Sequence, residues 1–422
     1  MYATAIAASS MEYSSESTTP PRGRSSKRRS PTQDISERRA KRPKAFGNVY
    51  DVQMATPPTF QAPTPSRSRS RSQSPARKII NLLRTSIPSV QVEAETAIPG
   101  NAPVTKLWRE LTVALKKPYV TQRIYDELDM VERSKLVCDA PGDVAFGDIT
   151  EDELLRDMDK LLLEAGRSDK YHQDEASWMN IVRDVLLMLS RVRAARSTTK
   201  GEFQVVDIRS QTHKVEYLPQ YTDKVPHFTK MFDKRTDFAL AFDIESPRVQ
   251  AMQQSCRISG SHDALPLSHM NDSFTQTLPL FAPIEVKRQG GSSEDAEVQL
   301  AVWQASAIRH KLGFLTGDVF CMDQIDNGLA PQISWTIIGH DWTPYLSWYD
   351  FDDGMHMIPI TGLRLGTRNR ATLLGLVAVF EEVWRWATDV HWKDFDGLMV
   401  RHQDRLTDGR RPQVSRVERS RA

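Results

Sequence analysis

The spacing of apolar residues changes near residue 203, and this change limits the possible folds more than any other feature of the sequence. Before it, three segments repeat apolar residues at intervals of three and four, which predicts amphipathic helices: 105–117, 150–166 and 174–193. Thr150 followed by Glu153 forms a capping box, so we expect the second helix to begin there.

From residue 203 onwards the apolar period becomes two, as in strands with one buried face. Three segments show it before the next helical segment: 203–208, 236–243 and 282–287. A helix at 292–313 follows, with Leu300, Trp303 and Ala307 on one stripe. A strand pair at 332–350 and a helix at 369–389 complete the series. This order predicts an α/β or α+β sheet domain.

The first 88 residues differ from the rest in charge and in apolar content. They hold 16 Lys and Arg against 5 Asp and Glu, ten of the 24 prolines and none of the nine tryptophans. Burial in such a segment cannot offset the entropy of ordering it. We therefore predict a disordered Ser/Pro/Arg-rich arm at 1–100, a folded domain at 101–400 and a basic disordered tail at 401–422.

Short motifs in the arm point to the nucleus. Basic clusters at 25–30 and 37–44 have the layout of a bipartite import signal, which predicts a nuclear import receptor as a partner. The alternative is a solvated basic tail that binds any polyanion weakly. The arginine-serine repeat at 65–75 predicts a kinase as a second partner, because phosphate on serine cancels the arginine charge.

The folded part is acidic: subtracting the arm and the tail leaves 33 basic and 46 acidic groups in residues 89–400. A face that binds nucleic acid would therefore be a local patch, and three stretches offer one: "FDKRTD", "EVKRQ" and "IRHKLG". The sequence has no run of 18 or more apolar residues, so no membrane-spanning helix is expected.

Charged residues interrupt two of the predicted strands. Asp237 precedes a strand whose apolar face is Phe238, Leu240 and Phe242. Glu285 and Lys287 alternate with aliphatic residues in "APIEVK". If the two strands pair with their apolar sides together, all three charges lie on one shared, partly wet face. The alternative is an exposed cross-strand ion pair between Glu285 and Lys287, which contributes little to stability.

Two further polar residues lie in helices that flank these strands. Glu175 begins the predicted helix at 174–193, and Gln299 lies near the start of the helix at 292–313. Each has an ordinary explanation, because glutamate favours a helix N-terminus and glutamine is common on surfaces.

The ordered series Glu175, Asp237, Glu285, Lys287 and Gln299 resembles the motif of the PD-(D/E)XK nuclease superfamily. Four stretches between about 150 and 400 resemble, more narrowly, fungal PD-(D/E)XK nuclease-like domain proteins: 175–187, 268–289, 298–312 and 333–348. The resemblance implies a restriction-endonuclease-like fold, with a mixed central sheet flanked by helices. Thr236 replaces the proline of the motif, and the 48 residues from Asp237 to Glu285 require an excursion, expected near the site.

The resemblance also implies roles for these residues. Asp237, Glu285, the Val286 carbonyl and Glu175 would hold Mg²⁺ or Mn²⁺. Lys287 would orient the attacking water, and Gln299 would hold Lys287 or the substrate. The implied activity is metal-dependent hydrolysis of phosphodiester bonds in nucleic acid, DNA rather than RNA, in the nucleus. The alternative is an inactive nuclease-fold module that binds nucleic acid or protein.

Overall fold

The structure is a computed structural model, and it describes residues 74–94, 100–117, 119–138, 140–144, 146, 149–196, 202–221, 232, 234–258, 266–316 and 329–410. The predicted import signal, most of the arginine-serine repeat and the last part of the predicted tail lie outside these residues.

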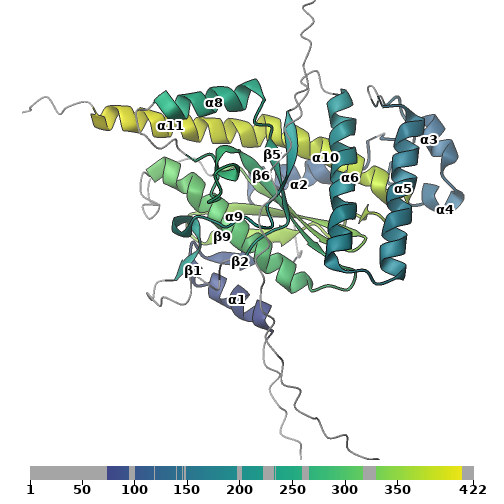
Figure 1. Cartoon of the computed structure of the whole chain (residues 1–422), viewed down its shortest axis with the longest axis horizontal. Coiled ribbons are helices and arrows are strands. Elements are labelled where there is room, and N and C mark those ends of the chain that lie inside the picture. Colours follow the sequence, from purple (N-terminus) through teal and green to yellow (C-terminus); the bar gives the residue numbers. More distant parts are fainter. Residues whose placement is uncertain are drawn as a thin grey trace, which may run out of the picture. The chain divides into compact units, whose positions relative to one another are not determined.

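A mixed sheet forms the centre of the domain (Figure 1). Its strands lie in the order β2-β9-β8-β7-β6-β5-β3, and β10 pairs with β8. The strands are β2 (Val90–Val92), β3 (Phe203–Asp207), β5 (Phe238–Phe242), β6 (Leu280–Lys287), β7 (Gln332–Ile338), β8 (Asp341–Asp350), β9 (Gly354–Pro359) and β10 (Leu365–Gly366). The β6–β7 and β2–β9 pairs are parallel and the others antiparallel, which confirms the mixed sheet. A separate small ladder joins β1 (Ser86–Ile87) to β4 (Gln220–Tyr221).

Helices cover both faces of this sheet. They are α1 (Pro75–Leu83), α2 (Ala102–Ala114), α3 (Gln122–Glu127), α4 (Met130–Arg133), α5 (Glu151–Lys170), α6 (Glu175–Arg196), α8 (Pro247–Ile258), α9 (Ser293–Thr316), α10 (Arg370–Trp386) and α11 (Trp392–Arg410). Side chains of α2, α6 and α10 pack with Phe238, Ile284 and Trp335 on one face. On the other face α9 crosses the sheet and packs against α1 and α11 (Figure 1). None of the helices in the described part of the chain combines the length and apolar character needed to cross a bilayer.

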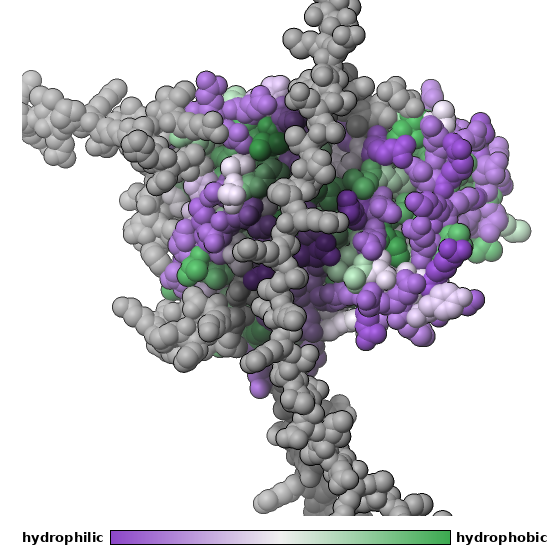
Figure 2. Space-filling view, viewed as in Figure 1, coloured by the Kyte–Doolittle hydropathy of each residue, from purple (hydrophilic) through white to green (hydrophobic). Residues whose placement is uncertain are grey.

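The predicted helices and strands of the domain are confirmed. Helix α5 begins after Thr150, whose hydroxyl accepts from the Glu153 N–H while the Glu153 carboxylate accepts from the Thr150 N–H. The apolar faces are buried, and the outer surface around α5 is mostly hydrophilic, with a few apolar side chains between (Figure 2). Strand β9 and helix α11 were not predicted; α11 follows α10 directly through a π-helical turn, Ala387–His391, so no break in the sequence marks its start.

The prediction that the arm reaches residue 100 is wrong for its last part. Helix α1 buries Ala76, Ile79 and Leu83, a spacing of three and four that fits an amphipathic helix. Strand β2 pairs with β9 and forms an edge of the sheet. Averaging charge over 88 residues hid this short apolar pattern. The predicted tail also begins too early, because α11 continues to Arg410.

The excursion between Asp237 and Glu285 was expected near the site, and this expectation is wrong for its described parts. Strands β5 and β6 are antiparallel, and Asp237 precedes β5 while Glu285 lies near the end of β6. The connection therefore leaves and returns at the opposite end of the strand pair. Its first part forms α8, which lies beside α11 (Figure 1).

Candidate active site

The pairing of β5 with β6 brings Asp237 beside Glu285. The Asp237 N–H donates to the Ile284 carbonyl at 3.1 Å, and its Oδ2 accepts from the Val286 N–H at 2.8 Å. Asp237 thus bonds the β6 backbone on either side of Glu285, through its N–H at Ile284 and through its carboxylate at Val286. The predicted pairing, apolar side to apolar side, is confirmed, since Phe238 and Ile284 are register partners and share one core. The Val286 carbonyl points to the same side of β6 as its N–H, towards β5.

Glu285 is fully buried between two strands and a helix. Its exposed fraction is 0%, its register partner on β7 is Thr336, and α9 covers this face of the sheet. The Oε1 atom lies 2.5 Å from Lys287 Nζ, whereas Oε2 has no hydrogen-bond partner among the described residues. The exposed ion pair considered above is therefore excluded, and the partly wet face was also a wrong expectation at this position.

Burial and neighbouring charges act on the protonation of the two carboxyl groups. Burial is the main cause that raises the pKa of Glu285 well above its ordinary range, and the nearby Asp237 carboxylate adds to it. The pKa of Asp237 rises to about 6, again chiefly through burial, although the Val286 N–H and Lys287 act in the opposite direction. Two carboxyl groups that resist ionisation side by side form a site that favours a cation.

Lys287 connects these carboxylates to α6. Its Nζ lies 2.5 Å from Glu285 Oε1 and 3.5 Å from Glu175 Oε1, and 14% of its side chain is exposed. Burial opposes its positive charge, but Glu285, Glu175 and Asp237 together outweigh burial and raise its pKa. Glu175 is the first residue of α6, so the helix start fixes its position over the end of β6.

Gln299 lies in the second turn of α9 and also faces this region. Its Nε2 donates to the Arg235 carbonyl at 2.5 Å, so the amide braces the segment that leads into Asp237. The structure does not bear out the prediction that Gln299 holds Lys287. Thr236, which replaces the motif proline, is buried, and its hydroxyl has no partner within the described part of the chain.

A cleft of about 550 Å³ opens over Lys287. Its wall combines groups from β6, α6, α9, the turn between β6 and α9 and the segment before β5: Glu175, Lys234, Lys287, Arg288, Gly290, Gly291, Ser292, Asp295, Val298 and Gln299. Gly290 has a φ of +74°, and a Cβ at Gly291 would lie 2.8 Å from the Cβ of Lys287. The turn after β6 therefore needs two glycines to leave room beside the lysine.

The basic patch expected from three sequence stretches is present only in part. Lys234 and Arg288, from "FDKRTD" and "EVKRQ", line the cleft. The third stretch does not contribute, because Arg309, His310 and Lys311 are all buried in α9. Arg309 donates to the Leu218 carbonyl, and Lys311 lies 3.5 Å from Asp394. These cations face inward because α9 is packed on nearly every side.

Comparison with known families agrees with this geometry. The family model of the PD-(D/E)XK nuclease superfamily matches residues 125–392, which include every candidate site residue. The chain belongs to the PD-(D/E)XK nuclease superfamily. A comparison with curated proteins finds none that matches the chain. Membership of the superfamily indicates a nuclease-like protein, and nucleases of this superfamily generally use divalent metals. The narrower resemblance to fungal proteins stays a prediction.

The donor set of the site fits such a metal. Mg²⁺ and Mn²⁺ prefer hard oxygen ligands, and Asp237, Glu285 and Glu175 offer carboxylates. The buried and unpartnered Glu285 Oε2 is an oxygen that needs a cation or a donor. No group of three or more His, Cys, Asp or Glu in the described ranges already has the arrangement of a metal site. Lys287 instead occupies the space between Glu285 and Glu175.

Proposed function

We propose that the chain hydrolyses phosphodiester bonds in nucleic acid, with a divalent metal as cofactor and DNA as the first substrate to test. The observation that carries this proposal is the buried Glu285, whose Oε2 lacks a partner, beside Asp237 and Lys287 under an open cleft. Buried carboxyl groups with raised pKa values, brought together with a lysine at a cleft, are typical of catalytic sites rather than of structural ion pairs.

Each residue has a task that follows from its position. Asp237, Glu285 and the Val286 carbonyl would hold the metal, with Glu175 joining from α6. When bound, Mg²⁺ or Mn²⁺ supplies charge neutralisation at the phosphoryl group and helps to activate water. Lys287 reaches the same space with its Nζ, so it orients the attacking water and offsets the negative charge of the transition state. Gln299 positions the segment of Asp237 through the Arg235 carbonyl.

One observation favours a second candidate, a nuclease-fold module without catalytic activity. Lys287 already contacts both Glu285 and Glu175, so the ammonium group compensates the carboxylates without a metal. A protein that kept this ion pair could bind nucleic acid without cutting it, or could bind a protein partner. The two candidates differ in whether a divalent metal displaces the ammonium group from Glu285.

Cleavage assays with purified full-length chain separate the two candidates. We expect wild type to cut single-stranded or duplex DNA with Mg²⁺ or Mn²⁺ and to stop in excess chelator. Lys287→Ala should bind metal but lose cleavage, whereas Asp237→Asn should lose both. Lys393→Ala, an exposed lysine on α11, is the matched control and should cut normally. If the wild-type chain neither binds metal nor cuts DNA, the catalytic proposal fails and the inactive binding module is the remaining candidate.

We propose further that this activity belongs in the nucleus, on the basis of the basic clusters at 25–30 and 37–44. A fluorescent fusion that lacks residues 22–44 should lose nuclear accumulation, because the deletion removes both clusters. A fusion with the lysines and arginines of those clusters kept and the serines replaced by alanine is the control. Equal accumulation of the deletion and wild type would contradict the import signal.

A further inference from the structure

A second hollow, which the active-site residues do not line, lies beside the start of α10. Its volume is about 670 Å³, and residues of three segments form its wall: 134–137, 341–343 and 361–372. Three cations line it, Lys135, Arg364 and Arg368, against one carboxylate, Asp341. The hollow thus has two more positive than negative charges in its wall. Residues 89–400 as a whole hold 13 more acidic than basic groups, 46 against 33, so this local excess of positive charge is unusual.

Two of these cations are available to a ligand. Lys135 and Arg364 are exposed, and neither has an ion-pair or hydrogen-bond partner for its side chain among the residues that the structure describes. Arg368 is held in place by Asp341, with Nε and Nη2 donating to the two carboxylate oxygens at 2.8 and 2.7 Å. One guanidinium group held in position, beside a second arginine and a lysine without partners, suits a phosphate.

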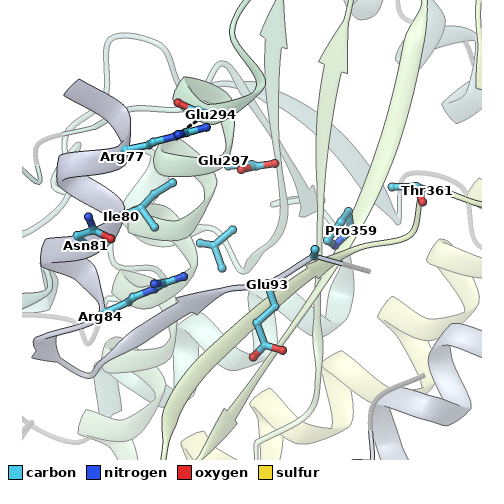
Figure 3. A pocket seen from close by; sticks show the side chains of 11 residues that line it. Arg77, Ile80, Asn81, Arg84, Glu93, Glu294, Glu297, Pro359 and Thr361 are labelled. Carbon is cyan, nitrogen blue, oxygen red and sulfur yellow. Dashed lines mark hydrogen bonds and ion pairs between the residues drawn. The ribbon is translucent and has the colours of Figure 1, made fainter. Parts of the chain in front are cut away.

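Another hollow on the same domain shows what an ordinary cavity of this size looks like. Figure 3 shows a hollow of about 620 Å³ between α1 and α9, with two arginines and three glutamates in its wall. There Arg77 pairs with Glu294 at 2.8 Å, and Ser74 donates to the same carboxylate at 2.8 Å. The three glutamates outnumber the two arginines, so this hollow offers no excess positive charge, unlike the one beside α10.

The basic hollow lies at the same end of the sheet as the active site. Register partners link the two across neighbouring strands: Lys287 with Ile338, Ile338 with Asp341, and Asp341 with Gly366. Three strand spacings separate Lys287 from Gly366, which is about 14 Å. Successive phosphates of one strand in a duplex rise along its axis and also turn around it, so their separation in space exceeds the axial rise of about 3.4 Å, and the hollow lies only a few nucleotides from the scissile phosphate.

We propose that Lys135, Arg364 and Arg368 form a subsite for a backbone phosphate of the nucleic-acid substrate, a few nucleotides from the cleavage position. This inference rests on the proposed function. None of the residues that line the subsite also lines the catalytic cleft, so the two contact the strand at separate points. The subsite holds the substrate in place and takes no part in bond cleavage.

Salt-dependent binding tests the subsite apart from catalysis. In a Glu285→Gln background, we expect Lys135→Ala with Arg364→Ala to weaken binding of a labelled DNA of about 12 nucleotides roughly tenfold. The slope of log K against log salt should fall by about 1, because the lost contact to one phosphate removes about 0.7 to 0.9. Binding of a dinucleotide should not change, because it does not reach the subsite. Arg364→Lys should keep most of the affinity.

The control is Arg109→Ala with Lys393→Ala. It removes one arginine and one lysine that are exposed and lie outside both the active-site cleft and the hollow beside α10. In an otherwise wild-type chain, the Lys135/Arg364 pair should raise KM and leave kcat within about twofold. Unchanged salt slope in a chain that still cuts DNA would overturn the subsite alone. If the Lys135/Arg364 pair of substitutions abolishes binding of poly-glutamate but leaves DNA binding unchanged, the hollow is a site for acidic peptides. That result would also overturn the phosphate subsite. A wild-type chain that neither binds nor cuts DNA would overturn both proposals.

Discussion

The carboxylate site and a cluster of buried histidines lie on the same face of the sheet under α9, yet they bury ionisable groups in opposite ways. His213, His269 and His310 are buried, and burial lowers the pKa of each. His213 Nδ1 lies 3.0 Å from Ser306 Oγ, and His269 packs edge-on against Trp303 with ring centroids 4.4 Å apart. These rings stay neutral and serve as packing.

The carboxylates differ because they keep a cation beside them. Glu285 pairs with Lys287 and still has one unpartnered oxygen. A neutral histidine contributes to stability through its contacts, whereas two neighbouring buried carboxylates cost stability that a cation or protonation recovers. The comparison teaches that burial alone does not mark a functional site. A functional site is marked by burial combined with an unsatisfied charge.

The largest expected difference between the two regions is in the effect of substitution on catalysis. Glu285→Gln should lower the cleavage rate by at least about 10²- to 10³-fold, because it removes one ligand and the charge beside Lys287. Its free energy of unfolding without metal should stay the same or rise. His213→Ala should do the reverse, with a loss of about 2–4 kcal/mol of stability and a normal rate per folded molecule. Urea titrations and single-turnover rates measure both, and similar profiles for the two variants would contradict the comparison.

Acidification should affect the two regions with opposite sign. His213 has a pKa of about 4 against an ordinary value of 6.5, so the unfolded chain binds the proton first and stability is lost as the pH falls from about 6.5 towards 4. That loss is on the order of 3 kcal/mol for this histidine alone. Asp237, with a pKa of about 6 against 3.8, gains stability over the same fall in pH. Asp237→Asn should therefore lose stability more steeply than wild type between pH 7 and 5, and equal slopes would rule out this assignment.

Metal should stabilise the carboxylate region only. At a concentration 100 times its Kd, Mg²⁺ or Mn²⁺ should raise the free energy of unfolding by about 2.7 kcal/mol, because it binds the native chain and relieves the repulsion at Glu285 and Asp237. Thermal melts with and without metal measure the shift. Asp237→Asn should show none, whereas His213→Ala should keep it. A shift that survives Asp237→Asn would place the metal elsewhere.

The smallest effect is expected from Gln299, which acts through the backbone. Gln299→Ala removes one hydrogen bond to the Arg235 carbonyl and should lower the cleavage rate about fivefold, equivalent to about 1 kcal/mol. Gln253 is a matched control, because its amide donates to the Thr277 carbonyl at 3.0 Å in the excursion away from the site. Gln253→Ala should change stability by a similar amount and leave the pH dependence of the cleavage rate unaltered. Gln299→Ala should instead shift the part of this pH dependence that reports the ionisation of Asp237.

Much of the fold could be predicted from the sequence because its signals are local. The capping box at Thr150, the period-two runs of β5 and β6 and the apolar stripe of α9 each depend on neighbouring residues. The grouping of Asp237 with Glu285 and Lys287 also followed from alternation along two strands. Strand β2 was missed because its partner lies at the other end of the chain.

The environment of the site could not be predicted from these local patterns. Alternation places Glu285 on a face, but only the packing of α9 decides that the face is dry. The partner of Gln299 depends on the path of the segment before β5, and the inward position of Arg309 and Lys311 depends on Leu218 and Asp394. These contacts join residues far apart in sequence, where spacing carries no information.

The parallel pairing of β2 with β9 has a consequence for how the protein folds. Val90 meets Met355, so this edge of the sheet closes a loop of 265 residues, the difference between the two positions. Loop closure of that length is entropically costly, and contacts of such separation slow folding. During synthesis β2 waits for nearly the whole domain to leave the ribosome. The N-terminal edge should therefore dock last, and its amide protons should be the latest of the sheet to gain protection in a pulse-labelling experiment.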